Sequence, residues 1–196
     1  MRALLTSLML IVPAAANAAS VSIDVRGPDG KPLAGAVVQV RSAHMPDAAA
    51  GLPGPYVVAQ KNIAFQPHVL IVPVGASVSF PNRDRVRHHV YSFSAPKRFE
   101  LKLYGQEEAR SVTFDKPGVV ALGCNIHDSM SGFVVVSDTP WAAQTDEKGH
   151  AAFRDVPPGA VTLSVWHPGV RAPGNMLSQP GTVAGGGLTT TLVIRR

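Results

Sequence analysis

The sequence predicts an all-β fold, and three observations support this. Short apolar runs, alternating or continuous, recur along the chain, while the spacing of three to four residues that is typical of amphipathic helices is almost absent. The 17 prolines and 18 glycines lie mostly between these runs, where they favour turns and disfavour long helices. The runs that predict strands are 21–25, 36–40, 69–72, 77–81, 111–114, 119–122, 133–136, 161–165 and 189–194.

The segment before the first predicted strand has the pattern of a secretory signal peptide. Arg2 precedes an apolar run over residues 3–12, and small residues follow up to Ala18, after which we expect cleavage. The apolar run is shorter than the roughly 18 residues that a spanning helix needs, and no later run reaches that length. We therefore expect a periplasmic protein without a membrane anchor.

The charge balance excludes a nucleic-acid-binding protein. Lys and Arg number 18 against 13 Asp and Glu, which is a mild excess. The densest basic group, Arg83, Arg85 and Arg87, is not interleaved with aromatic residues, as a surface that stacks bases would be. The excess is compatible with an acidic protein partner.

Two breaks in the strand pattern divide the chain. Residues 43–55 are rich in Ala, Pro and Gly, and a second break follows the apolar strand at Thr139-Pro140. Between them lies a block of about 80 residues, a common size for one domain. We expect a signal peptide, a central domain and a discontinuous second β-sandwich, at residues 1–18, 57–137 and 19–43 plus 139–196.

The flanking segments resemble one known module. Residues 27–38 are similar to the opening of a carboxypeptidase regulatory-like, or Cna-B-like, β-sandwich, and residues 145–159 are similar to its middle hairpin. In that family the two pieces lie close together in sequence. The resemblance therefore implies a structural module, with the central block either inserted into it or packed beside it with swapped-in strands. Residues 169–187 carry Gly and Pro without a strand pattern, which predicts a long loop.

The single cysteine, Cys124, cannot form an intramolecular disulfide. It is either a buried core residue or a metal ligand. It follows a predicted strand directly and begins the pattern Cys124-x-x-His127-x-x-Met130, which places a thiolate, an imidazole and a thioether on one short loop. A blue-copper site uses one thiolate, two imidazoles and a weaker axial thioether. A second histidine must then come from another strand end.

A strand, a loop and two adjacent histidines occur upstream, over residues 74–90. Together with the cysteine loop, they resemble the plastocyanin and amicyanin branch of the cupredoxins, which are Greek-key β-sandwiches. The likeness extends to an exported group labelled methylamine utilisation proteins. Aligning Asn82 with the family asparagine puts His88 on the first ligand position, but a loop shift of one residue would exchange it with His89. The family usually has asparagine in place of His89, where it ties the two ligand loops together, so an imidazole must do this or the tie is missing.

The resemblance implies one type 1 copper ion, bound by His88, Cys124, His127 and Met130, in a monomeric electron carrier. It implies electron exit through His127 to a c-type cytochrome or a periplasmic dehydrogenase. The alternatives are a copper delivery or storage protein and a purely structural module; no enzyme is expected, because no catalytic motif or second copper site is visible. Ile126 replaces a family proline, and its N–H can donate to the sulfur, which would raise the reduction potential. We expect the remaining histidines to be structural or solvated: His44, His68, His150 and His167.

Overall fold

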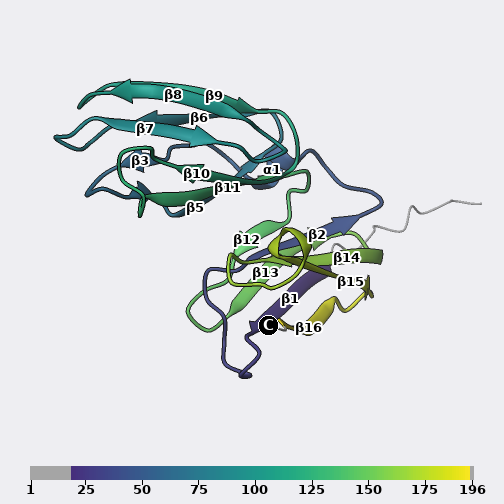
Figure 1. Cartoon of the computed structure of the whole chain (residues 1–196). Helices are drawn as coiled ribbons and strands as arrows, with labels where there is room; N and C mark the ends of the chain where they lie inside the picture. Colours follow the sequence, from purple (N-terminus) through teal and green to yellow (C-terminus); the bar gives the residue numbers. More distant parts are fainter. Residues whose placement is uncertain (1–18, 195–196) are drawn as a thin grey trace, which may run out of the picture.

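The computed structural model describes residues 19–194, so the predicted signal peptide lies outside the described residues. The all-β prediction is confirmed: sixteen strands fold into two stacked bodies (Figure 1). Helical structure in the described range is limited to α1 (Ala48–Gly51) and a short 3-10 turn, η1 (Pro173–Asn175). Neither is long enough to cross a membrane, and residues 19–194 contain no other candidate.

The first body is a sandwich built from the middle of the chain. One sheet has five strands, and all neighbours are antiparallel except β5 and β11, which are parallel. Its order is β5 (Val69–Pro73), β11 (Ser131–Ser137), β10 (Gly118–Gly123), β7 (His88–Ser92) and β8 (Phe99–Tyr104). The facing layer consists of two pairs joined by isolated bridges: β6 (Ala76–Pro81) with β9 (Ala109–Phe114), and β3 (Ala59–Gln60) with β4 (Phe65–Gln66).

The core of this sandwich follows from residue alternation. In β6, Ala76, Val78 and Phe80 are buried, whereas the serines between them face outward. The same apolar cluster includes Cys124 and Met130. The two ends of the cysteine loop therefore lie at one end of the core, whereas Asn125, Ile126, Asp128 and Ser129 between them are exposed.

The second body is also a two-sheet sandwich, built from both flanks of the chain. One sheet has the order β13 (His150–Val156), β1 (Ala19–Arg26) and β16 (Leu188–Val193), with β1 and β16 parallel. The other has the order β12 (Ala142–Gln144), β2 (Val37–Ser42), β14 (Gly159–Trp166) and β15 (Met176–Val183).

The strand β15 corrects the prediction of a long loop over residues 169–187. It pairs with β14 along its whole length, although it contains Pro180 and Gly181. Proline lacks the N–H that a central strand needs, but β15 is the last strand of its sheet and needs hydrogen bonds on one side only. Proline and glycine, which predict a loop from the sequence, here mark an edge strand.

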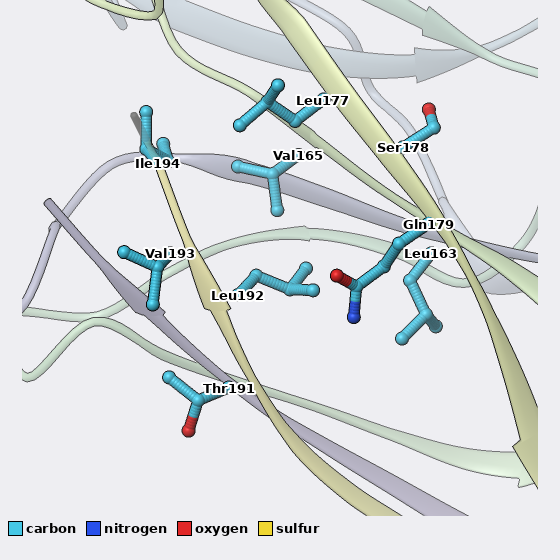
Figure 2. Close-up of a pocket in the computed structure, with 9 residues that line it drawn as sticks. All are labelled: Leu163, Val165, Leu177, Ser178, Gln179, Thr191, Leu192, Val193 and Ile194. Carbon is cyan, nitrogen blue, oxygen red and sulfur yellow. The ribbon is translucent and has the colours of Figure 1, made fainter. Parts of the chain in front are cut away.

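This edge leaves the second sandwich partly open. Between β15 and β16 lies a groove of about 410 Å³ whose walls come from both sheets, including Leu163, Leu177 and Leu192 (Figure 2). Both bordering strands pair on one side only.

The two bodies are connected through adjacent strands and a shared apolar contact. The chain leaves the second sandwich after β2 and returns in β12, and these strands pair with each other. Val37 and Trp166 of the second body pack with Val135 of the first, and the ring of Trp166 meets Phe133 edge-on with centroids 4.9 Å apart. An ion pair between Arg41 and Asp138, 2.6 Å from Nε to Oδ1, holds the two connecting segments together.

Candidate metal centre

Three possible metal ligands converge at one end of the first sandwich. His88, Cys124 and His127 each offer a ligand atom, and these atoms all lie within 4.8 Å of one another. The Sγ of Cys124 is 3.9 Å from the Nδ1 of His88 and 3.9 Å from the Nδ1 of His127. With bonds of about 2.0–2.3 Å, two ligands at trigonal angles on one ion stand about 3.7 Å apart. The spacing therefore fits a single ion shared by all three residues.

Strand pairing brings the two ligand segments together. His88 begins β7, and Cys124 follows the last residue of β10. The antiparallel register of Gly123 with Tyr91 places that end of β10 beside β7. The loop then turns back on itself, because the N–H of Met130 donates to the carbonyl of His127 at 2.9 Å.

The centre is buried on all sides but one. The exposed fraction is 0% for His88, 3% for Cys124 and 2% for Met130, whereas His127 is partly exposed. Met130, the fourth expected ligand, packs in the same cluster as Cys124. One thiolate, two imidazoles and a nearby thioether form a soft donor set that suits copper. The site fits one copper ion, with the ring of His127 as its contact with the surface.

The two adjacent histidines face different surroundings. The Nδ1 of His88 faces Cys124, while the Nε2 of His89 lies 2.8 Å from the Oε1 of Glu100 on β8. Successive residues of a strand point to opposite faces, so only one of the two can reach the cluster. No hydrogen bond between residues 19–194 connects the His89 side chain to the cysteine loop, and its buried Nδ1 has no partner there. Of the two alternatives, His88 is the one in the cluster, and the tie between the loops is missing.

A carboxylate lies behind His88. The Oδ2 of Asp84 is 2.8 Å from the Nε2 of His88, and the backbone N–H groups of Asn62 and Ile63 donate to Asp84 at 2.6 Å and 2.9 Å. Desolvation raises the pKa of Asp84, but the hydrogen bonds from Ile63, His88 and Asn62 outweigh it and lower that pKa below its ordinary value. Asp84 is therefore an ionised carboxylate at neutral pH. It was missed in the sequence, where nothing marks it as a partner of His88.

Buried polar side chains hold the segment that carries His88. The Nδ2 of Asn82 donates to the carbonyls of Val86 at 2.9 Å and Tyr104 at 3.0 Å, and its Oδ1 accepts from the N–H of Asp84 at 2.9 Å. The hydroxyl of Tyr104 donates to the carbonyl of Phe80 at 2.7 Å. Burial raises the pKa of Tyr104 to about 12, so its phenol stays neutral in ordinary conditions.

The other histidines lie outside the cluster. His150 bonds to Asp24 at 2.9 Å, the Nδ1 of His68 lies 3.1 Å from the carbonyl of Ser131, and His167 accepts from the N–H of Gly169. The expected donation to the sulfur is not seen: Ile126 is exposed, and the hydrogen bonds among the described residues include none from its N–H to Cys124.

Two facing β-layers with a His, Cys, His cluster at one end form the arrangement expected from the sequence resemblance. This unit is cupredoxin-like.

Solved structures similar to the chain include copper proteins. A copper-containing nitrite reductase from Thermus scotoductus SA-01 is 32% identical over 43% of this chain, with a TM-score of 0.41, and this chain spans about a quarter of its length (23%). An amicyanin variant in its reduced Cu(I) form at pH 4 is 27% identical over 51% of this chain and 98% of its own, with a TM-score of 0.40. A second reduced amicyanin variant gives the same values. No protein-family model and no curated protein matches the chain.

Proposed function

We propose that this protein is a type 1 copper protein that carries single electrons, with His88, Cys124, His127 and Met130 as the ligands. The observation that supports this most strongly is the convergence of three ligand atoms within 4.8 Å, from two separate segments, in a buried pocket that Met130 also joins. Bound copper would supply a one-electron couple between Cu(II) and Cu(I).

The role of the protein is to fix the positions of the ligands in a buried site. His88 and Cys124 are anchored by paired strands, and Met130 is packed in the core. Packed side chains at the end of a β-sandwich do not rearrange easily. The same ligand positions can therefore serve both oxidation states, which keeps the rearrangement that accompanies each transfer small.

Electrons would pass through the partly exposed ring of His127, next to the exposed side chain of Ile126 (48% exposed). The donor and acceptor would be other redox proteins, such as a c-type cytochrome or a periplasmic dehydrogenase. Encounters of this kind bury little area and are weak and brief. The signal-peptide pattern of residues 1–18 supports a periplasmic location. A monomer is part of the same proposal.

The division of labour between the two bodies is part of the proposal. Residues 57–137 would form the copper domain, inserted into a structural sandwich made of residues 19–43 and 139–196. The pairing of β2 with β12 supports insertion, because it places the two connections side by side.

The test is the visible spectrum of the mature protein titrated with Cu(II), measured beside Cys124→Ser. We expect an intense band from charge transfer between thiolate and copper in the wild type, with one copper per chain, and no such band in the variant. Copper bound to the wild type without the band would favour copper delivery by the same ligands. The burial of His88, Cys124 and Met130 argues against delivery, which needs ligands that an acceptor can reach.

A further inference from the structure

The two nitrogens of the His88 ring have different partners. Nδ1 lies 3.9 Å from the Sγ of Cys124, and Nε2 lies 2.8 Å from the Oδ2 of Asp84. The ring is fully buried, so water does not compete for either nitrogen. A neutral imidazole carries one proton, and a carboxylate can only accept it. The proton therefore belongs on Nε2, which leaves the lone pair of Nδ1 facing the cysteine.

Asp84 is itself fixed in place. Its Oδ1 accepts from the N–H of Asn62, and its Oδ2 accepts from the N–H of Ile63 as well as from His88. Asn62 and Ile63 both have φ of 57°, a left-handed conformation that is uncommon for a β-branched residue. This turn aims two consecutive N–H groups at one carboxylate, whose side chain is only 12% exposed. The carboxylate cannot easily turn away from His88.

His127, the other imidazole of the cluster, differs from His88 in its hydrogen-bond partners. Among residues 19–194, the hydrogen bonds of His127 include no carboxylate, and the ring is partly exposed. A second pair of the same kind exists one residue away, because His89 and Glu100 also meet at 2.8 Å. His89 lies outside the cluster. The two pairs thus differ in whether the imidazole faces the metal centre and in the exposure of the carboxylate, which is 57% for the Glu100 side chain.

We propose that Asp84 is a positioning residue that fixes the tautomer of His88 and lowers the reduction potential of the copper site. This inference rests on the function proposed above. A carboxylate that accepts the remote N–H of a ligand imidazole makes the ring a stronger electron donor. Stronger donation favours the more highly charged oxidised ion over the reduced one. The negative charge of Asp84 acts in the same direction.

The experiment compares the reduction potentials of wild type, Asp84→Asn and Glu100→Gln by redox titration of the visible band. Each variant removes one negative charge from an imidazole partner, but only Asp84 contacts a residue of the cluster. Outer partners of metal ligands change metal affinity by about tenfold or more. A change of about tenfold in the preference for Cu(I) over Cu(II) is a rise of about 59 mV for a one-electron couple. We expect that rise in Asp84→Asn and a smaller one in Glu100→Gln; equal shifts would overturn the proposal.

A second measurement does not depend on the variant folding or on copper. Long-range ¹H–¹⁵N spectra of the metal-free wild type report which ring nitrogen of each histidine carries the proton. In the neutral ring of His88 we expect the proton on Nε2; a neutral ring with its proton on Nδ1 would contradict the assigned role. A wild type that shows no visible band with copper would refute the proposed function, whereas a normal band with equal shifts in the two variants would refute only the role of Asp84.

Discussion

At the scale of single residues, His88 and His89 have separate tasks although they are neighbours. His88 contributes a nitrogen to the cluster, and His89 binds Glu100. We expect His88→Gln to lose the visible copper band, because no second imidazole can replace it. His89→Gln should keep the band, because an amide can still reach the carboxylate. Cu(II) titrations of both variants, with circular dichroism to establish folding, make the comparison, and the reverse result would assign the ligand to His89.

Tyr104 makes the stability of the protein sensitive to alkaline pH. Burial raises its pKa to about 12, above the value of about 10 for an unfolded tyrosine. The stabilisation that the raised pKa of Tyr104 gives to the folded protein is therefore fully present below about pH 10, and it is lost as the pH rises through about 12.

Tyr104→Phe removes this titration together with two hydrogen bonds, one donated to the carbonyl of Phe80 and one accepted from the Nε2 of Gln60. We expect its unfolding free energy to be about 1–3 kcal/mol lower at neutral pH and to fall less steeply than that of the wild type between about pH 10 and 12. Urea unfolding at several pH values measures both effects. Tyr91→Phe is the control, since the described residues give its hydroxyl no hydrogen bond; a parallel pH dependence in wild type and Tyr104→Phe would exclude this role.

The residues that sequence reasoning could find are those whose signal is local. Cys124, His127 and Met130 lie on one loop, so their spacing alone suggests a shared ion. Asp84 has no such signal, because its position depends on hydrogen bonds from a turn more than twenty residues away. Whether His88 or His89 faces Cys124 likewise depends on the pairing of β7 with β10, which the local sequence does not reveal.

At the scale of elements, the contact between β11 and β14 joins the two bodies. Trp166 is buried against Phe133 and Val135, across the boundary between the sandwiches. Trp166→Ala should lower the free energy of unfolding by about 3–5 kcal/mol, because it empties a site that neither body can refill alone. The variant should also weaken the coupling between the unfolding of the two sandwiches. Calorimetry should then show two unfolding transitions where the wild type shows one.

Val193→Ala provides the control for this variant, because Val193 is 53% exposed and its truncation should change stability little. A Trp166→Ala protein that unfolds in a single transition, with no more loss than Val193→Ala, would show that the contact does not couple the bodies.

Strands were predictable where apolar residues alternate and unpredictable where pairing alone makes the strand. β1 and β6 have a clear alternating pattern and agree with the sequence expectation within about two residues at each end. β15 has no such pattern and exists because β14 offers it an edge. A prediction from local sequence cannot include that edge, because it belongs to the neighbouring strand β14.

At the scale of the whole molecule, the order of synthesis has a consequence. β2 needs β12 and β14 as neighbours, and β1 needs β13 and β16, yet all four of these partners follow the first sandwich in the chain. The middle of the polypeptide is therefore complete at a stage when β1 and β2 still lack their partner strands. Domains tend to fold as units as they emerge. Assembly would therefore proceed from the inside outward, and the outer sandwich would close only around a centre that has already formed.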